Sequence, residues 1–441
     1  MDNSQTGRPL QVFNNLSAIA VVIGIVVGIG IFRLPTMVAQ NSSTELHYIA
    51  FWIAGGIISV LGALCYAELA TAKPDAGGEY HFLTEAYGST VGFLFSWGRM
   101  TVIQTGSIAL GAFILGDYAS VIYDLGEYSS SIYAAITVIL LTGLNILGTQ
   151  PSLNIQSLFT GAIVAILILA GLIGLFNGTE VSASAESPTS TVKSSAGAAM
   201  IFVLLTYGGW NEGVYLSAEI KDVRRNMSRV LLYGLAGITL IYVLINTAYL
   251  QVLGLDTIRN SDAVGVALSN QIMGSDASFI VAVIVIISAF STANATIITG
   301  ARTNYALGRD FSLFKFIGRW NGSCNAPVNA LLVQGAIALG LIILGSITKE
   351  AVTTMVDYTA PVFWFFILLT TASLFIFRSR TVEEKESFKV PFYPVTPILF
   401  IIVCLYLLYS SIIFTGMGAF VGIGILLLGL PLYLIARLKK S

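Results

Sequence analysis

The chain has 441 residues, of which 56% are hydrophobic and only 10% are charged. Soluble domains carry about 25% charged residues, so this composition excludes an ordinary water-soluble protein. The formal net charge of -1 also excludes a strongly basic protein of the kind that binds nucleic acid.

Apolar stretches of about 20 residues, the length that crosses a bilayer core, recur along the whole chain. They predict an all-α membrane protein with twelve transmembrane helices, and the connecting segments are too short for a separate soluble domain. The predicted spans are 13–40, 48–71, 90–116, 130–148, 154–176, 197–218, 229–253, 277–305, 327–346, 351–377, 393–414 and 418–437.

Lysine and arginine residues in the connectors predict the orientation, because basic loops resist transfer across the membrane. An even number of spans places both termini on the same side of the membrane. Most of the basic residues, including the C-terminal cluster at 437–440, fall on that side. The connectors of the opposite side hold only Lys193, Arg259 and Lys349. We therefore expect both termini in the cytoplasm.

The first span contains a cluster of glycines, Gly24, Gly28 and Gly30, followed by Pro35, which lacks a backbone donor. The sixth span contains a second cluster at 206–211, with Gly208 and Gly209. Both clusters predict interrupted helices, and an interruption at mid-membrane frees backbone N–H and C=O groups for a ligand. The alternative is that these glycines only permit close helix packing.

These segments resemble the amino acid-polyamine-organocation (APC) superfamily, and within it the L-type amino acid transporters. The similar segments are 28–32, 207–211, the second-to-third-span loop at 65–88, and the end of the eighth span at 294–309. The resemblance implies a leucine-transporter-like fold of two inverted five-helix repeats, at 1–176 and 177–377, followed by two additional spans at 378–441.

The resemblance also implies a substrate site between the two breaks. The amides of Ile29 and Gly30 are expected to bind a carboxylate, and the carbonyls of Val26, Leu205 and Gly208 an ammonium group. Half-helix ends suit these charges, because N-termini offer free donors and C-termini free acceptors. The other expected contacts are Val27, Gly28, Thr206, Tyr207 and Asn211, with Ile103, Thr105, Phe363 and Trp364 lining the pocket.

The chain departs from the family pattern at three places. Ile29 replaces a small residue, Leu205 stands where relatives often carry an aromatic gate, and the run 153–176 lacks the lysine that many sodium-independent relatives use as a fixed cation. A sodium ion is one candidate for that position. Its expected ligands are the carbonyls of Gly24 and Val27 and the hydroxyls of Ser291 and Thr292, unless these hydroxyls only bond their own helix.

Charged residues inside spans are costly and therefore indicate function. Glu212 is a candidate proton carrier, or else the partner of Arg99 or Arg302 in a structural bridge. Arg33 and Asp357 are expected to form an outer gate with Leu205; the alternative is that Arg33 extends to the headgroups.

We therefore predict a secondary active transporter of neutral L-amino acids that works by alternating access. We expect it in the plasma membrane, namely a bacterial inner membrane. The alternatives are a transporter of polyamines or other organocations and an amino acid sensor that does not transport. We expect no enzymatic activity, no nucleic acid partner, and no cofactor other than a coupling Na⁺ or H⁺. In some members of the resembled family a partner subunit is attached through a cysteine between the third and fourth spans. The loop 116–131 has no cysteine, so a disulfide-linked partner subunit is not expected.

Overall fold

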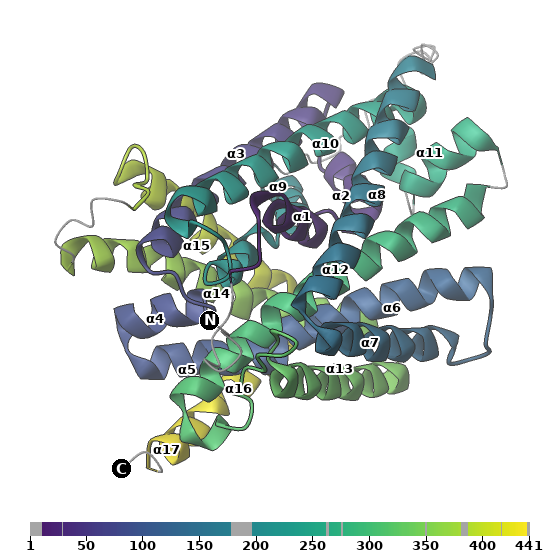
Figure 1. Cartoon of the computed structure of the whole chain (residues 1–441). Coiled ribbons are helices and arrows are strands. Elements are labelled where there is room, and N and C mark those ends of the chain that lie inside the picture. The colour runs from purple at the N-terminus through teal and green to yellow at the C-terminus, as the bar shows by residue number, and fades with distance from the viewer. Residues whose placement is uncertain are drawn as a thin grey trace.

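The computed structural model describes residues 11–28, 30–177, 196–261, 264–274, 277–348, 351–380, 387–415 and 417–438. All named elements within these ranges are helices (Figure 1). The first group runs from the N-terminus to the end of the fifth predicted span: α1 (Asn15–Val26), α2 (Gly30–Gln40), α3 (Glu45–Ala72), α4 (Glu79–Tyr87), α5 (Ser89–Gly98), the π-helix η2 (Arg99–Ile103), α6 (Gln104–Ile122), α7 (Ser129–Leu147) and α8 (Thr149–Asn177).

The second group completes the chain. It comprises α9 (Ala196–Tyr207), the 3-10 helix η3 (Trp210–Leu216), α10 (Val223–Asn260), α11 (Val264–Met273), α12 (Ala277–Asp310), the 3-10 helix η4 (Ser312–Phe314), α13 (Val328–Thr348), α14 (Ala351–Arg380), α15 (Val395–Thr415), α16 (Met417–Leu427) and α17 (Gly429–Leu438). The short helices α4 and α11 lie in connectors where the sequence predicts no helix.

Ten of the described helices are long and apolar enough to cross a membrane, and the pair α1 and α2, bent by 50°, brings this number to eleven. The sixth predicted span is the one that does not qualify. Its first part, α9, has only 12 residues, and the chain continues as the 3-10 helix η3. The exact number of twelve spans therefore stays a prediction.

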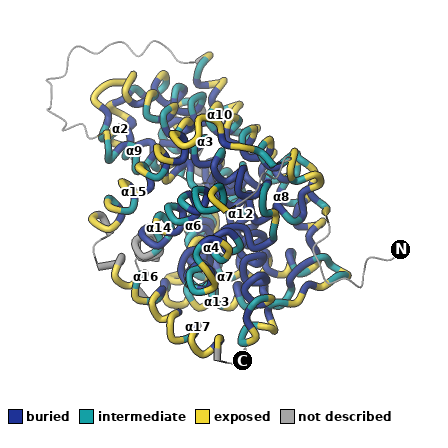
Figure 2. Tube along the Cα trace, turned by 90° about the vertical axis from the view of Figure 1, so that its left-hand side faces the viewer, coloured by how far each residue is buried: buried dark blue, intermediate teal, exposed yellow. Residues whose placement is uncertain are grey.

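Large apolar side chains cover the outside of the molecule. Leu140 on α7, Leu158 on α8, Ile343 on α13 and Ile413 on α15 are all more than half exposed. Figure 2 shows buried residues along the middle of the molecule and exposed ones on outer helices such as α17. Water does not favour such an exterior, whereas lipid tails do. The chain is a multi-pass membrane protein.

The helix α1 lies inside this arrangement and packs against α8, α10 and α12 (Figure 1). It begins at an N-cap, where the Asn14 side chain accepts a hydrogen bond from the Ser17 amide over 2.8 Å. Its residues have almost no polar face, since the surrounding surfaces are other helices rather than solvent. The end of α1 is thereby placed in the interior of the protein.

Candidate substrate site

The helix α1 ends at Val26, and α2 begins at Gly30. Two backbone bonds close the end of α1, from the Val27 amide to the Ile23 carbonyl at 2.7 Å and from the Gly28 amide to the Val26 carbonyl at 2.8 Å. Ile29, whose amide is an expected carboxylate ligand, lies outside the described residues. The interruption lies at the glycine cluster of the first predicted span.

The second interruption separates α9, which ends at Tyr207, from η3, which begins at Trp210. Gly209 between them has a φ of 105°, a left-handed conformation that residues with a side chain rarely adopt. A Cβ atom at Gly209 would also lie 2.6 Å from Cγ2 of Ile25. Both conditions require glycine, so the helix stops here and its free end faces α1.

The two interruptions lie against each other. A Cβ atom at Gly30 would lie 3.3 Å from Cγ2 of Thr206, and Gly209 approaches Ile25 as described above. The glycines thus allow the backbones of α1, α2 and α9 to approach closely. As a result, four helix ends meet in the interior of the protein.

Tyr242 on α10 joins the two interruptions. Its hydroxyl lies 2.8 Å from the Val26 carbonyl and 3.1 Å from the Thr206 carbonyl, so its single proton is shared between the C-terminal ends of α1 and α9. The ring is fully buried and packs edge-on against Tyr207 at 5.0 Å. No role for Tyr242 is predicted from the sequence. A tyrosine in the middle of a long apolar span is itself a signal, because its hydroxyl needs a partner there.

The four expected sodium ligands also lie together, between α1 and α12. The Thr292 hydroxyl donates to the Gly24 carbonyl at 3.0 Å, and the Ser288 hydroxyl donates to the Val27 carbonyl at 3.3 Å. Ser291 accepts a hydrogen bond of 2.9 Å from Nε2 of Gln156 on α8. The oxygens of this group fit a hard cation, but the Gln156 amino group does not, since it presents hydrogens. The carbonyl of Gln156 would have to face the cation instead.

Glu212 on η3 forms a buried ion pair with Arg99 on η2. Both guanidinium amino groups contact the carboxylate, one at 2.9 Å from Oε1. Arg99 also donates to Thr303 and stacks on the Tyr215 ring at 4.0 Å. The other arginine considered for Glu212, Arg302, pairs with Glu219 instead. The structural bridge is therefore present, and Arg99 is its cation.

A further carboxylate, that of Glu79 at the start of α4, lies next to this pair. It accepts hydrogen bonds from the hydroxyls of Tyr66 and Tyr215. Burial raises the pKa of Glu79, while the charge of Arg99 and the two hydroxyls oppose this rise. Glu79 falls within the segment 65–88 that resembles the superfamily, but its contacts are not predicted from the sequence.

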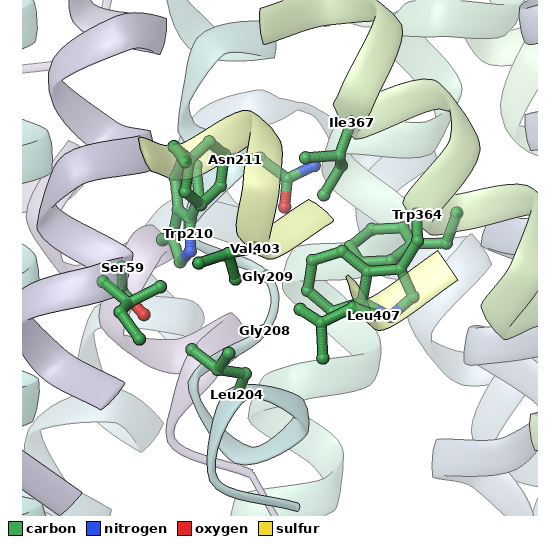
Figure 3. A pocket seen from close by; sticks show the side chains of 13 residues that line it. Ser59, Leu204, Gly208, Gly209, Trp210, Asn211, Trp364, Ile367, Val403 and Leu407 are labelled. Atoms are coloured by element: carbon green, nitrogen blue, oxygen red, sulfur yellow. The ribbon is translucent and has the colours of Figure 1, made fainter. Parts of the chain in front are cut away.

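A pocket opens beside the second interruption. Gly208, Gly209 and Asn211 form one wall, and the rest comes from α3, α9, α14 and α15 (Figure 3). Of the expected lining residues, Phe363 and Trp364 border this pocket. Ile103 and Thr105 are buried elsewhere, and Tyr207 faces away, because its hydroxyl donates to the Trp52 carbonyl at 3.0 Å.

A protein-family model described as amino acid permease matches residues 13–435, nearly the entire chain. The chain belongs to the amino acid permease family.

Three relatives illustrate the range of similarity within this permease family. The b(0,+)-type amino acid transporter 1 of Mus musculus is 31% identical over 407 residues, which cover 90% of this chain and 82% of that protein. The serine/threonine exchanger SteT of Bacillus subtilis (strain 168) is 28% identical over 431 residues, 97% of each chain. The Asc-type amino acid transporter 1 of Homo sapiens is 26% identical over 439 residues, covering 97% of this chain and 82% of that protein.

The expected outer gate of this permease is described only in part. Arg33 lies exposed on α2 and interacts electrostatically with Asp117 near the end of α6. Asp357 belongs to α14, but its side chain lies outside the described part of the structure. Leu205, the third gate residue, has a side chain that is 46% exposed near the end of α9. The pairing of Arg33 with Asp357 stays a prediction.

Proposed function

We propose that this permease transports neutral amino acids across the membrane by alternating access. Family membership and relatives named as amino acid transporters support amino acid transport. The observation that carries the proposal is the contact between two interrupted helices inside a multi-pass membrane protein. Such a junction supplies free backbone groups where lipid cannot reach them.

The substrate of this proposal is a zwitterion bound by the main chain. The amides of Ile29 and Gly30 hold its carboxylate, and the carbonyls of Val26, Leu205 and Gly208 hold its ammonium group. Two of these carbonyls also accept hydrogen bonds within the protein, Val26 from Tyr242 and Leu205 from the Gly208 amide. Helix dipoles favour both assignments, since an N-terminus is partly positive and a C-terminus partly negative. No charged side chain is needed for either end.

A neutral substrate side chain fits the surroundings of the junction. Among the described residues, none that lines the pocket beside Gly208 is charged. Glu212, the carboxylate nearest to the break in the chain, is already paired with Arg99. A polyamine or another organocation requires an uncompensated buried carboxylate, and this pairing removes the obvious one.

The finer features of the family belong to the same proposal. We place the inverted repeats at 1–176 and 177–377, the additional spans at 378–441, both termini in the cytoplasm and the protein in the plasma membrane. For the coupling ion two alternatives stay open. One is Na⁺ beside Gly24, Val27, Ser291 and Thr292, and the other is a proton on Glu212. We propose that no disulfide-linked subunit is attached.

The proposal is tested by uptake of a panel of labelled amino acids into proteoliposomes, with Na⁺ and pH gradients imposed separately. Neutral amino acids are expected to accumulate or exchange. Loss of uptake without Na⁺ supports the sodium alternative. Dependence on the pH gradient alone, lost in Glu212→Gln, supports the proton alternative. If the correctly folded, reconstituted protein shows no amino acid flux, the result contradicts transport and favours the alternative of an amino acid sensor.

Gly30→Leu tests the site itself. A side chain at Gly30 must push against Thr206, so the junction cannot keep its geometry, and overpacking of this kind lowers uptake by about tenfold or more. Gly340→Leu on α13 is the matched control, because a Cβ atom there has no neighbour within 4 Å. Uptake should be retained in the control. Equal uptake by both variants would contradict the proposed site.

A further inference from the structure

A group of buried titratable side chains lies where η3 meets η2 and the start of α4. It contains two carboxylates, those of Glu79 and Glu212, but a single cation, Arg99. All three residues are buried. With both carboxylates ionised, the group has one negative charge in excess. Such an excess is costly in the interior of a membrane protein, and a bound proton removes it.

Arg99 pairs with Glu212 and not with Glu79. Both terminal amino groups of the guanidinium contact the Glu212 carboxylate, and its Nε donates at 3.0 Å to a hydroxyl on α12. In the described structure, the oxygens of Glu79 accept hydrogen bonds only from the hydroxyls of Tyr66 and Tyr215. The paired carboxylate stays ionised, so Glu79 is the one that takes the neutral form. Burial accordingly raises the pKa of Glu79.

Among the described residues, no further cation faces Glu79 from the helices packed against α4, which are α5 and α14. The helix α5 contains no charged residue. On α14, Arg378 pairs with a carboxylate of α3, and Arg380 donates to the Glu85 carbonyl. On α4 itself, His81 contacts the Glu85 carboxylate. The charge of Glu79 therefore has no partner of its own.

The hydroxyls around Glu79 can accommodate both of its forms. Tyr66 donates to the carboxylate when Glu79 is ionised, and its oxygen accepts the acid proton when Glu79 is neutral. In the second case Tyr66 needs another acceptor for its own hydrogen. The fully buried Thr370 hydroxyl on α14 lies near Tyr66 and has no hydrogen-bond partner among the described residues. It is therefore available to complete the chain for the neutral form.

We propose that Glu79 binds a coupling proton of this permease. Glu79 holds the proton while η3 lies against η2 through the pair of Arg99 and Glu212, which is the arrangement of this structure. The inference rests on the proposed function, from which it takes alternating access. Of the two coupling ions left open there it selects the proton, and it assigns this proton to Glu79 rather than to Glu212.

Alternating access supplies the step that releases the proton. When the permease opens on this side, η3 moves away from η2, and Glu212 separates from Arg99. The O–H bond of Glu79 then breaks, the proton passes to the entering water, and the Glu79 carboxylate replaces Glu212 beside the guanidinium. The cation has one carboxylate partner in both arrangements, so proton release accompanies the conformational change.

Infrared spectroscopy of the purified protein detects the proton on Glu79 without any transport. At neutral pH the wild type should show the carbonyl band of a protonated carboxylic acid, and Glu79→Gln should remove it. Glu85→Gln is the matched control and should keep the band, because Glu85 lies on the same helix but is partly exposed and contacts Lys73 and His81. A wild type without the band, or a band that persists in Glu79→Gln, overturns the inference.

The pH dependence of uptake into proteoliposomes gives a second readout. The pKa of Glu79 is raised while Glu212 is paired with Arg99, so the proton bound in this arrangement is lost as the pH rises through that pKa. Uptake by the wild type should therefore fall as the pH is raised, by up to about tenfold per pH unit for one proton. Glu79→Gln, which stays neutral, should remove this dependence, and Glu85→Gln should keep it.

Tyr66→Phe leaves Glu79 in place and removes one donor to its carboxylate. The ionised form is then less stable, so the fall in uptake should move to higher pH. Tyr87→Phe on α4 is the control, because the Tyr87 hydroxyl donates to the Leu369 carbonyl at 2.9 Å and not to Glu79. An unshifted profile in Tyr66→Phe, or equal shifts in both variants, overturns the inference.

The outcomes separate the inference from the function on which it rests. Uptake of neutral amino acids at a rate that does not change with pH overturns the proton site and leaves the proposed transport intact. A protein that transports no amino acid fails the proposed function, whereas the infrared band still decides whether Glu79 binds a proton.

Discussion

Tyr242 bridges the two interrupted helices through a single hydroxyl group. Val26 is the last residue of α1 and Thr206 the last but one of α9, and the carbonyls of both lie within hydrogen-bond distance of the same oxygen. Without this donor, two helix ends inside a membrane have one partner fewer. We therefore expect Tyr242 to be a positioning residue for the main-chain groups that are proposed to bind the substrate.

Tyr242→Phe keeps the ring packing and removes only the hydroxyl. The loss of a hydrogen bond of about 0.5–1.5 kcal/mol corresponds to about a two- to twelvefold rise in the KM for uptake. Tyr233→Phe on the same helix is the control, because the Tyr233 side chain is largely exposed on the outer surface. Uptake kinetics of both variants give the comparison. An unaltered KM in Tyr242→Phe would show that the hydroxyl does not position the site.

The residues around the two helix breaks are predicted in part from their amino acid types. The amino acid types around the breaks predict backbone recognition, because clustered glycines interrupt helices. They do not predict that the Val26 carbonyl already has a partner in Tyr242, or that Tyr207 faces Trp52 instead of the pocket. Side-chain direction at a helix end depends on the dihedral angles of the break and on the neighbouring helix. The amino acid type at a single position specifies neither the dihedral angles nor the neighbouring helix.

At the scale of elements, the pair of Arg99 and Glu212 joins η2 to η3. The π-helix η2 belongs to the third predicted span, and η3 follows the second interruption, so this pair fixes the element behind the break to a helix that crosses the membrane. Periodicity in the sequence predicts neither the π-helix nor the 3-10 helix, since both are local departures from a regular span.

Arg99→Met leaves the Glu212 carboxylate buried without its cation. Breaking a buried pair in this way costs about 3–5 kcal/mol, so the thermal unfolding midpoint in detergent should fall clearly. The double variant with Glu212→Met should recover part of the loss, because no charge is then left unpaired. Lys73→Met is the control. The bridge of Lys73 to Glu85 is partly exposed and 3.4 Å long, and such pairs contribute about 0–1 kcal/mol. Equal shifts for Arg99→Met and Lys73→Met would contradict this view.

At the scale of the whole molecule, the distribution of basic residues predicts which connectors face the cytoplasm. Cys324 lies in the connector between α12 and α13, which also carries Arg319 and Lys315. It is partly exposed, whereas Cys65 and Cys404 are buried. A single native cysteine is thus accessible to a reagent in water.

A thiol reagent that cannot cross the membrane should label Cys324 in inside-out vesicles and not in intact cells. Mass spectrometry of the labelled peptide measures this directly, and Cys324→Ser should abolish the signal. Labelling of Cys324 in intact cells would reverse the predicted orientation, including that of both termini.

The sequence by itself determined the membrane class, the positions of most spans and the two glycine clusters that interrupt helices, because these features depend on composition and on local backbone freedom. Only the tertiary structure decided which distant groups meet. Tyr242 contacts two helix ends, and Glu212 pairs with Arg99 and not with Arg302; both contacts join residues more than thirty positions apart. Such contacts arise from the packing of whole helices, which fixes side-chain positions that no local segment specifies.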